Sequence, residues 1–101
     1  MAYYTYILYS ESRGRFYKGS TNDVYSRFKR HNYGYVNSTS TGRPWRLLWY
    51  TCKDDRGSAI ILERKLKNLS AKKTIEFMLK YESDLTEGSK IYLEELWSKM
   101  K

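Results

Sequence analysis

The chain has 101 residues, of which 41% are apolar, and its formal net charge at neutral pH is +8. This length fits one domain with a modest hydrophobic core, and no stretch approaches the ~18 apolar residues of a membrane span. The start, Met1-Ala2-Tyr3-Tyr4, lacks the basic and apolar segments of a secretion signal. A single cysteine, Cys52, excludes an internal disulfide and a cysteine-rich zinc site, so we expect a reducing, cytoplasmic setting.

The positive charge is concentrated in the first four fifths of the chain. Residues 1–81 contain sixteen Lys and Arg against six Asp and Glu, whereas residues 82–101 contain three against five. Such a basic body favours a polyanionic partner, although many small basic domains use their charge only for solubility. A membrane surface is disfavoured, because no segment pairs a broad basic face with a face of Trp, Phe and Leu.

The first third of the chain is predicted to form a hairpin and a helix. The aromatic and β-branched segment Tyr3–Tyr9 is typical of a strand, and Arg15–Gly19 is the expected returning strand after a turn at residues 10–14. Residues 20–23 offer N-cap candidates for a helix from about Val24 to His31.

The remainder is predicted to add one strand and three helices. After a polar loop at residues 35–43, the apolar run in Trp45–Cys52 is typical of a central strand covered on both faces. Ser58 is the expected cap of a second helix, and Ser70 is expected to begin a third. A loop around residues 85–88 precedes a last amphipathic helix. We therefore predict an α+β fold: a small three-stranded antiparallel sheet flanked by helices, with a ββαβα core and further C-terminal helices.

Two tyrosines lie one on each arm of the expected hairpin. Taken alone, Tyr6 and Tyr17 are ordinary strand residues in a chain that has eleven tyrosines. Their surroundings are less ordinary, since Gly19 permits a close backbone approach just before a helix N-terminus, which is itself a site for anions.

Two helices supply the complementary charges. Arg27 and His31 lie one turn apart along the edge of a buried stripe, and Glu63 flanks the apolar stripe of the next helix. Each residue also has a simpler interpretation. Arg27 would be solvated, His31 would interact with the free carbonyls at a helix end, and Glu63 would pair with Lys67 four residues later. Together, phenols, a guanidinium and a carboxylate on a basic surface suit metal-assisted cleavage of a phosphodiester.

These residues resemble the GIY-YIG nuclease superfamily over about residues 3–80, and most closely its small single-domain branch. The matching residues are Tyr4-Thr5-Tyr6, Tyr17-Lys18-Gly19, Arg27, His31, Thr-Gly-Arg-Pro-Trp at residues 41–45, and Glu63. Tyr4 stands where the first motif of the family has glycine, and Lys18 stands where the second has a branched residue. Because Lys18 is polar in a short strand, we expect it to point outward, toward DNA or water.

The resemblance implies a nuclease domain at residues 1–81. Residues 82–101 lie outside the resemblance, and we expect them to form an acidic amphipathic helical extension packed on the same domain. The resemblance also implies hydrolysis of DNA with one Mg²⁺ or Mn²⁺ held by Glu63 and with Arg27 on the scissile phosphate. Tyr17 would activate the attacking water with support from Tyr6. His31, with an ordinary pKa of ~6.5, is the alternative base or a relay, and the sequence leaves that choice open.

We predict a metal-dependent DNA endonuclease, structure-specific in repair or recombination. The alternatives are a nucleic-acid-binding module of the same fold without turnover and a protein-interaction domain. Tyr33 and Tyr35 are candidates for stacking on unpaired bases, whereas Trp45 is better suited to the core. The sequence is compatible with a monomer or a homodimer. The residues expected to contact DNA phosphates are Lys18, Lys29, Arg30, Arg43, Arg46, Lys67, Lys72 and Lys73.

Overall fold

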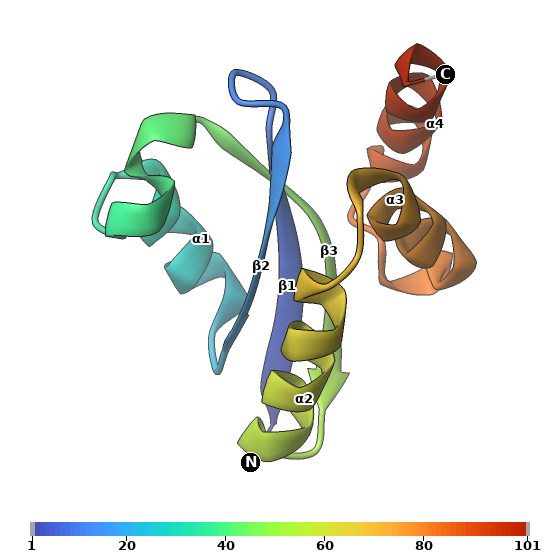
Figure 1. The fold of residues 1–101 in the computed structure, drawn as a ribbon. Coiled ribbons are helices and arrows are strands. Elements are labelled where there is room, and N and C mark those ends of the chain that lie inside the picture. The colour runs from blue at the N-terminus through green and yellow to red at the C-terminus, as the bar shows by residue number, and fades with distance from the viewer. Residues whose placement is uncertain (1, 101) are drawn as a thin grey trace.

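A three-stranded antiparallel sheet forms the centre of the molecule. Figure 1 shows the computed structural model, which describes residues 2–100. Strands β1 (Tyr3–Ser10) and β2 (Arg15–Thr21) form the expected hairpin, and β3 (Trp45–Lys53) pairs with the other side of β1. The strand order is therefore β2-β1-β3. The predicted α+β fold is confirmed.

The central strand is β1, so the prediction of a central position for the Trp45–Cys52 strand was wrong. Its apolar run has a different cause, because β3 is an edge strand that is covered on both faces: Trp45 packs on one side of the sheet and Trp49 on the other. A β-bulge opposite Ile7 and Leu8 skips Leu48 in the pairing, which lets Leu48 and Trp49 join the same core cluster.

Helices cover both faces of the sheet (Figure 1). On one face lie α1 (Val24–Asn32) and the short 3-10 helix η1 (Asn37–Gly42), which occupies the segment predicted as a polar loop. The other face is covered by α2 (Arg56–Lys67), α3 (Ala71–Lys80), the 3-10 helix η2 (Glu82–Asp84) and α4 (Ser89–Lys99).

Side-chain caps determine where three helices begin. The carboxylate of Asp23 accepts a hydrogen bond from the Ser26 amide, and the Ser70 hydroxyl accepts one from the Lys73 amide, as expected for N-caps. The cap predicted at Ser58 was wrong. Asp55 caps α2 instead, three residues earlier, because its Oδ1 accepts a hydrogen bond from the Ser58 amide at 2.7 Å.

Two hydrophobic clusters lie on opposite faces of the sheet. The larger includes Ile7, Trp49, Ile75 and Leu93, and the smaller is built from Tyr6, Leu8, Val24 and Trp45. Since Leu93 of α4 is fully buried beside β1 residues, the last helix packs on the same body as the sheet. Across residues 2–100, no helix is long and apolar enough to cross a bilayer.

Candidate active site

A chain of buried hydrogen bonds connects β1 to α1 and η1. The hydroxyl of Tyr6 lies 2.9 Å from Nε2 of His31, and Nδ1 of His31 lies 2.7 Å from Oγ1 of Thr39. The Thr39 hydroxyl in turn donates to the Val36 carbonyl at 3.3 Å. If Tyr6 donates to Nε2 of His31 and Nδ1–H of His31 donates to Thr39, every donor in this series of hydrogen bonds has an acceptor. We therefore assign the tautomer of His31 that carries its hydrogen on Nδ1.

Burial keeps the rings of Tyr6 and His31 uncharged at neutral pH. His31 is completely buried, and this burial, together with the charges of Arg27 and Arg30, lowers its pKa to about 4. Tyr6 is 1% exposed. Its burial raises the pKa well above the ordinary value for a phenol; Tyr17 and Glu63 also raise it, and Arg27 lowers it. Tyr6 and His31 are thus a neutral, hydrogen-bonded pair.

Tyr17 is the more accessible of the two site phenols. It lies on β2 and is only partly buried, with its ring centroid 4.8 Å from that of His31 and 6.2 Å from that of Tyr6. Its hydroxyl interacts with that of Tyr6, because Tyr17 raises the pKa of Tyr6. This phenol therefore combines contact with the buried pair and access to solvent.

The backbone of Gly19 lies directly against the two phenols. A Cβ atom at this position would come within 2.6 Å of the Tyr6 hydroxyl oxygen and within 3.0 Å of a ring carbon of Tyr17. Since no side chain fits there, glycine is required for the close approach expected from the sequence.

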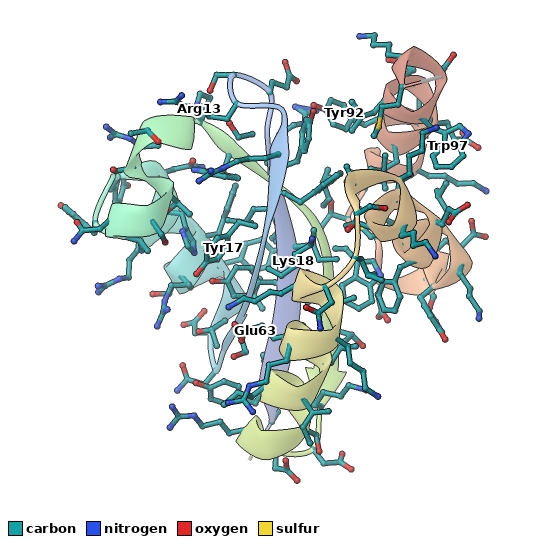
Figure 2. All side chains as sticks on the ribbon, in the orientation of Figure 1. Arg13, Tyr17, Lys18, Glu63, Tyr92 and Trp97 are labelled. Atoms are coloured by element: carbon teal, nitrogen blue, oxygen red, sulfur yellow. The ribbon has the colours of Figure 1, made fainter. Side chains whose placement is uncertain are left out.

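The carboxylate of Glu63 reaches β2 from α2. Its Oε1 accepts a hydrogen bond from the Ser20 hydroxyl at 2.7 Å, and its Oε2 pairs with Lys67 Nζ at 2.7 Å. In Figure 2, Tyr17 and Glu63 both lie next to β2, the first toward α1 and the second toward α2. Because β2 is an edge strand, groups from both faces of the sheet meet along its free side.

Arg27 completes the set of charges around the phenols. It lies on α1 and is partly buried, and no ion pair of its guanidinium occurs in the described part of the chain. Its charge lowers the pKa of His31, and it lowers the pKa of Tyr6, which the charge of Glu63 raises. The structure therefore gathers Tyr6, Tyr17, Arg27 and Glu63 around one strand.

The family of the chain follows from comparison with known proteins. A family model described as the GIY-YIG catalytic domain matches residues 2–76. The chain belongs to the GIY-YIG family. It is also similar to the solution NMR structure of the UPF0213 protein BH0048 from Bacillus halodurans, with 33% identity over 77% of this chain and 83% of that one, at a TM-score of 0.49. No curated protein matches the sequence significantly.

Membership in the GIY-YIG family makes this a protein of nuclease-type fold. The matched segment contains β1, β2, α1, β3 and α2, and hence all the side chains gathered along β2. It ends within α3, so η2 and α4 lie beyond the match.

One of the GIY-YIG motif residues lies differently from our expectation. Lys18 was expected to point outward, but it is only 9% exposed. Its side chain projects to the face opposite Tyr17, with Nζ 5.9 Å from the centre of the Phe16 ring, and burial lowers its pKa. The prediction was wrong because both faces of this short sheet are covered by helices, so neither face of β2 is free. Lys18 is thus a poor candidate for contacting DNA.

The other basic residues expected to contact DNA are distributed over both faces. Lys29 and Arg30 are exposed in the last turn of α1, and Arg43 is exposed beside η1. The guanidinium of Arg46 lies 4.2 Å from the centre of the Tyr92 ring, and Nζ of Lys72 lies 5.9 Å from that of Trp97, so these two lie near α4. Lys67 is paired with Glu63, and Lys73 is exposed in the first turn of α3.

Two site residues were missed in the sequence. Thr39 fixes the His31 ring, and its own carbonyl accepts from the Trp45 indole at 2.7 Å. Ser20 holds the Glu63 carboxylate. A signal for Ser20 existed, because it directly follows the second motif. Thr39 lies among several Ser and Thr in a loop-like segment, and only the fold distinguishes it from them.

Proposed function

We propose that the chain is a metal-dependent endonuclease that hydrolyses phosphodiester bonds of DNA. The observation that carries this proposal is the Ser20–Glu63 hydrogen bond, which places the carboxylate of α2 at the strand that bears Tyr17. With Arg27 on the other side of that strand, a phosphate beside β2 would meet a cation, an acid and a solvent-accessible phenol.

The acidic residues present fit only a weakly liganded metal ion. No group of three or more His, Cys, Asp or Glu side chains within residues 2–100 is arranged to hold a metal. One carboxylate suits Mg²⁺ or Mn²⁺, because Mg²⁺ is commonly held by one or two carboxylates, its own waters and substrate phosphate oxygens. Glu63 would hold the ion, which when bound would polarise the phosphate and stabilise the leaving oxygen.

Tyr17 is the best candidate for accepting a proton from the attacking water. It is partly exposed to solvent, and its ring lies against the buried pair of Tyr6 and His31. His31 is a poorer base, since it is buried and both its nitrogens are bonded. We assign to Tyr6 and His31 the positioning of the Tyr17 ring, and to Arg27 the binding of the phosphate.

One observation favours the alternative, a DNA-binding module without turnover. Both carboxylate oxygens of Glu63 already have protein partners, the Ser20 hydroxyl and the Lys67 ammonium. The charged Lys67 binds the carboxylate more strongly than the neutral hydroxyl does. A metal ion must compete with that ammonium. The Lys67 side chain is 53% exposed, so it can leave at little cost because exposed ion pairs contribute only ~0–1 kcal/mol.

A cleavage assay distinguishes the two. Branched, flapped, nicked and plain duplexes are incubated with Mg²⁺, with Mn²⁺ or with chelator, using the wild type, Glu63→Gln and the control Glu76→Gln, which changes an exposed glutamate of α3. We expect cleavage only with metal, its loss in Glu63→Gln with DNA binding retained, and no effect of Glu76→Gln. Binding of every substrate without cleavage by the wild type would favour the alternative, and cleavage in chelator would contradict the metal requirement.

A further inference from the structure

The segment that follows α1 presents two adjacent aromatic rings to solvent. Tyr33 and Tyr35 are 65% and 69% exposed, and their ring centroids lie 5.9 Å apart with the planes at 60°. A single exposed aromatic residue is ordinary on a protein surface. Two exposed rings in mutual contact form a small aromatic surface, and such surfaces mark binding sites more often than isolated residues do.

Hydrogen bonds fix the backbone that carries these two rings. The amides of residues 33, 34 and 35 donate to carbonyls of the last turn of α1, at 2.9, 3.2 and 3.0 Å. Gly34 has a φ of +81°, and a Cβ there would come within 2.7 Å of the Arg43 guanidinium. An aromatic surface that is already ordered loses less conformational entropy on binding.

The surroundings of the two rings are uniformly basic. Lys29 and Arg30 lie in the last turn of α1 and Arg43 lies against Gly34, while residues 24–53 contain no Asp or Glu. Further arginines bind the backbone of η1: Arg15 donates to the Ser38 carbonyl at 3.3 Å and Arg13 to the Thr41 carbonyl at 3.4 Å, and Figure 2 shows Arg13 beside η1. This charge favours a polyanion as the ligand, because phosphates gain affinity from each cation that neutralises them.

We propose that Tyr33 and Tyr35 form a stacking platform for unpaired bases, and that the preferred substrate is DNA in which a single strand adjoins a duplex. Within a duplex the faces of the bases are already stacked on one another, so only unpaired bases can stack on the platform rings. The platform begins two residues after His31, which contacts Tyr6. The platform therefore lies close to the buried pair of the candidate active site. The substrate class rests on the proposed nuclease function, whereas the platform itself does not.

Binding measurements in chelator test the platform without any need for cleavage. Fluorescence anisotropy gives Kd for a single-stranded oligonucleotide, a flapped duplex and a blunt duplex, with wild type and the double variant Tyr33→Leu/Tyr35→Leu. We expect the double variant to lose about tenfold or more in affinity for the first two, in keeping with the usual strength of base–aromatic stacking. Affinity for the blunt duplex should change less than twofold. The double variant Tyr33→Phe/Tyr35→Phe keeps both rings and should bind like wild type.

A tyrosine on the opposite side of the sheet provides the control. Tyr81 is 46% exposed and contacts Phe77 on α3, so Tyr81→Leu should leave all three affinities unchanged. An equal loss for single-stranded and blunt DNA in the Leu double variant, or no loss at all, would overturn the platform. Because binding is measured without metal, the result does not depend on whether the protein cleaves DNA. Normal cleavage without any stacking effect would overturn the platform and leave the proposed nuclease function intact.

Discussion

The state of the one histidine in the chain is open to a direct test by acid titration. His31 is fully buried, and both its nitrogens are hydrogen bonded, to Tyr6 and to Thr39. Protonation of His31 would put a positive charge into the core. It would also place a hydrogen on Nε2, opposite the Tyr6 hydroxyl that donates to Nε2 in the neutral pair. We therefore expect the imidazole to resist protonation in the folded protein.

The size of this resistance follows from the two pKa values. The folded-state pKa of His31 is about 4, whereas an unfolded chain has ~6.5. Between these values the unfolded state binds the extra proton, so the free energy of unfolding falls as the pH is lowered. The contribution of neutral His31 to the free energy of unfolding is fully present above pH ~6.5. It is lost progressively as the pH drops toward 4, and the total loss is about 3 kcal/mol.

Two assays measure this effect. The chain contains one histidine, so its ring Cε1–H resonance in an NMR pH titration belongs to His31, and we expect a midpoint near pH 4. Urea denaturation at neutral pH and near pH 4.5 should show a larger loss of stability for wild type than for His31→Gln, which carries no titrating ring. A midpoint near 6.5, or equal losses in the two proteins, would refute the buried neutral pair.

Three substitutions extend this reasoning. Arg27→Ala should abolish most cleavage and raise the pKa of the buried imidazole while stability changes by less than ~0.5 kcal/mol, as followed by activity, NMR titration and thermal unfolding. Lys67→Met should lower the Mn²⁺ concentration needed for binding several-fold in calorimetry, because it frees Oε2 of Glu63. Gly19→Ala should lower the free energy of unfolding by about 1–3 kcal/mol in urea denaturation, since its methyl group would overlap the phenol of Tyr6.

Each substitution has an outcome that would count against it. A large loss of thermal stability in the first variant would make Arg27 structural. Unchanged Mn²⁺ affinity in the second would mean that Lys67 does not compete for the carboxylate. The control for the third is Gly57→Ala in α2, where a Cβ would make only an ordinary contact, 3.5 Å from Asp55 Oδ1. That variant should be at least as stable as wild type, and equal effects of the two alanines would remove the steric argument.

Local patterns in the sequence were enough to predict most of the fold. The stripe of α2 and the aromatic strands of the hairpin are signals carried by neighbouring residues, so the elements were placed within one to three residues of their observed bounds. The position of β3 was missed because an apolar run shows that a strand is covered, not that it has two neighbours. The true cap of α2 was missed because Asp55 and Ser58 are both good cap residues.

Less of the candidate site could be predicted, because it depends on which side chains meet across the fold. Tyr6, Tyr17, Arg27 and Glu63 were singled out from their spacing and from the family resemblance. His31 was placed at a helix edge, but helical periodicity does not reveal that η1 closes over it and buries it. The burial of Lys18 likewise depends on a helix that comes forty residues later.

The central claim is that the carboxylate of Glu63 and the phenols belong to one metal-binding centre, and Mn²⁺ titration followed by NMR tests it most directly. Bound Mn²⁺ broadens the resonances of nearby nuclei. We predict selective broadening of the ring signals of Tyr17 and His31, and its loss in Glu63→Gln. Broadening confined to other parts of the chain, or unaffected by that substitution, would contradict the claim.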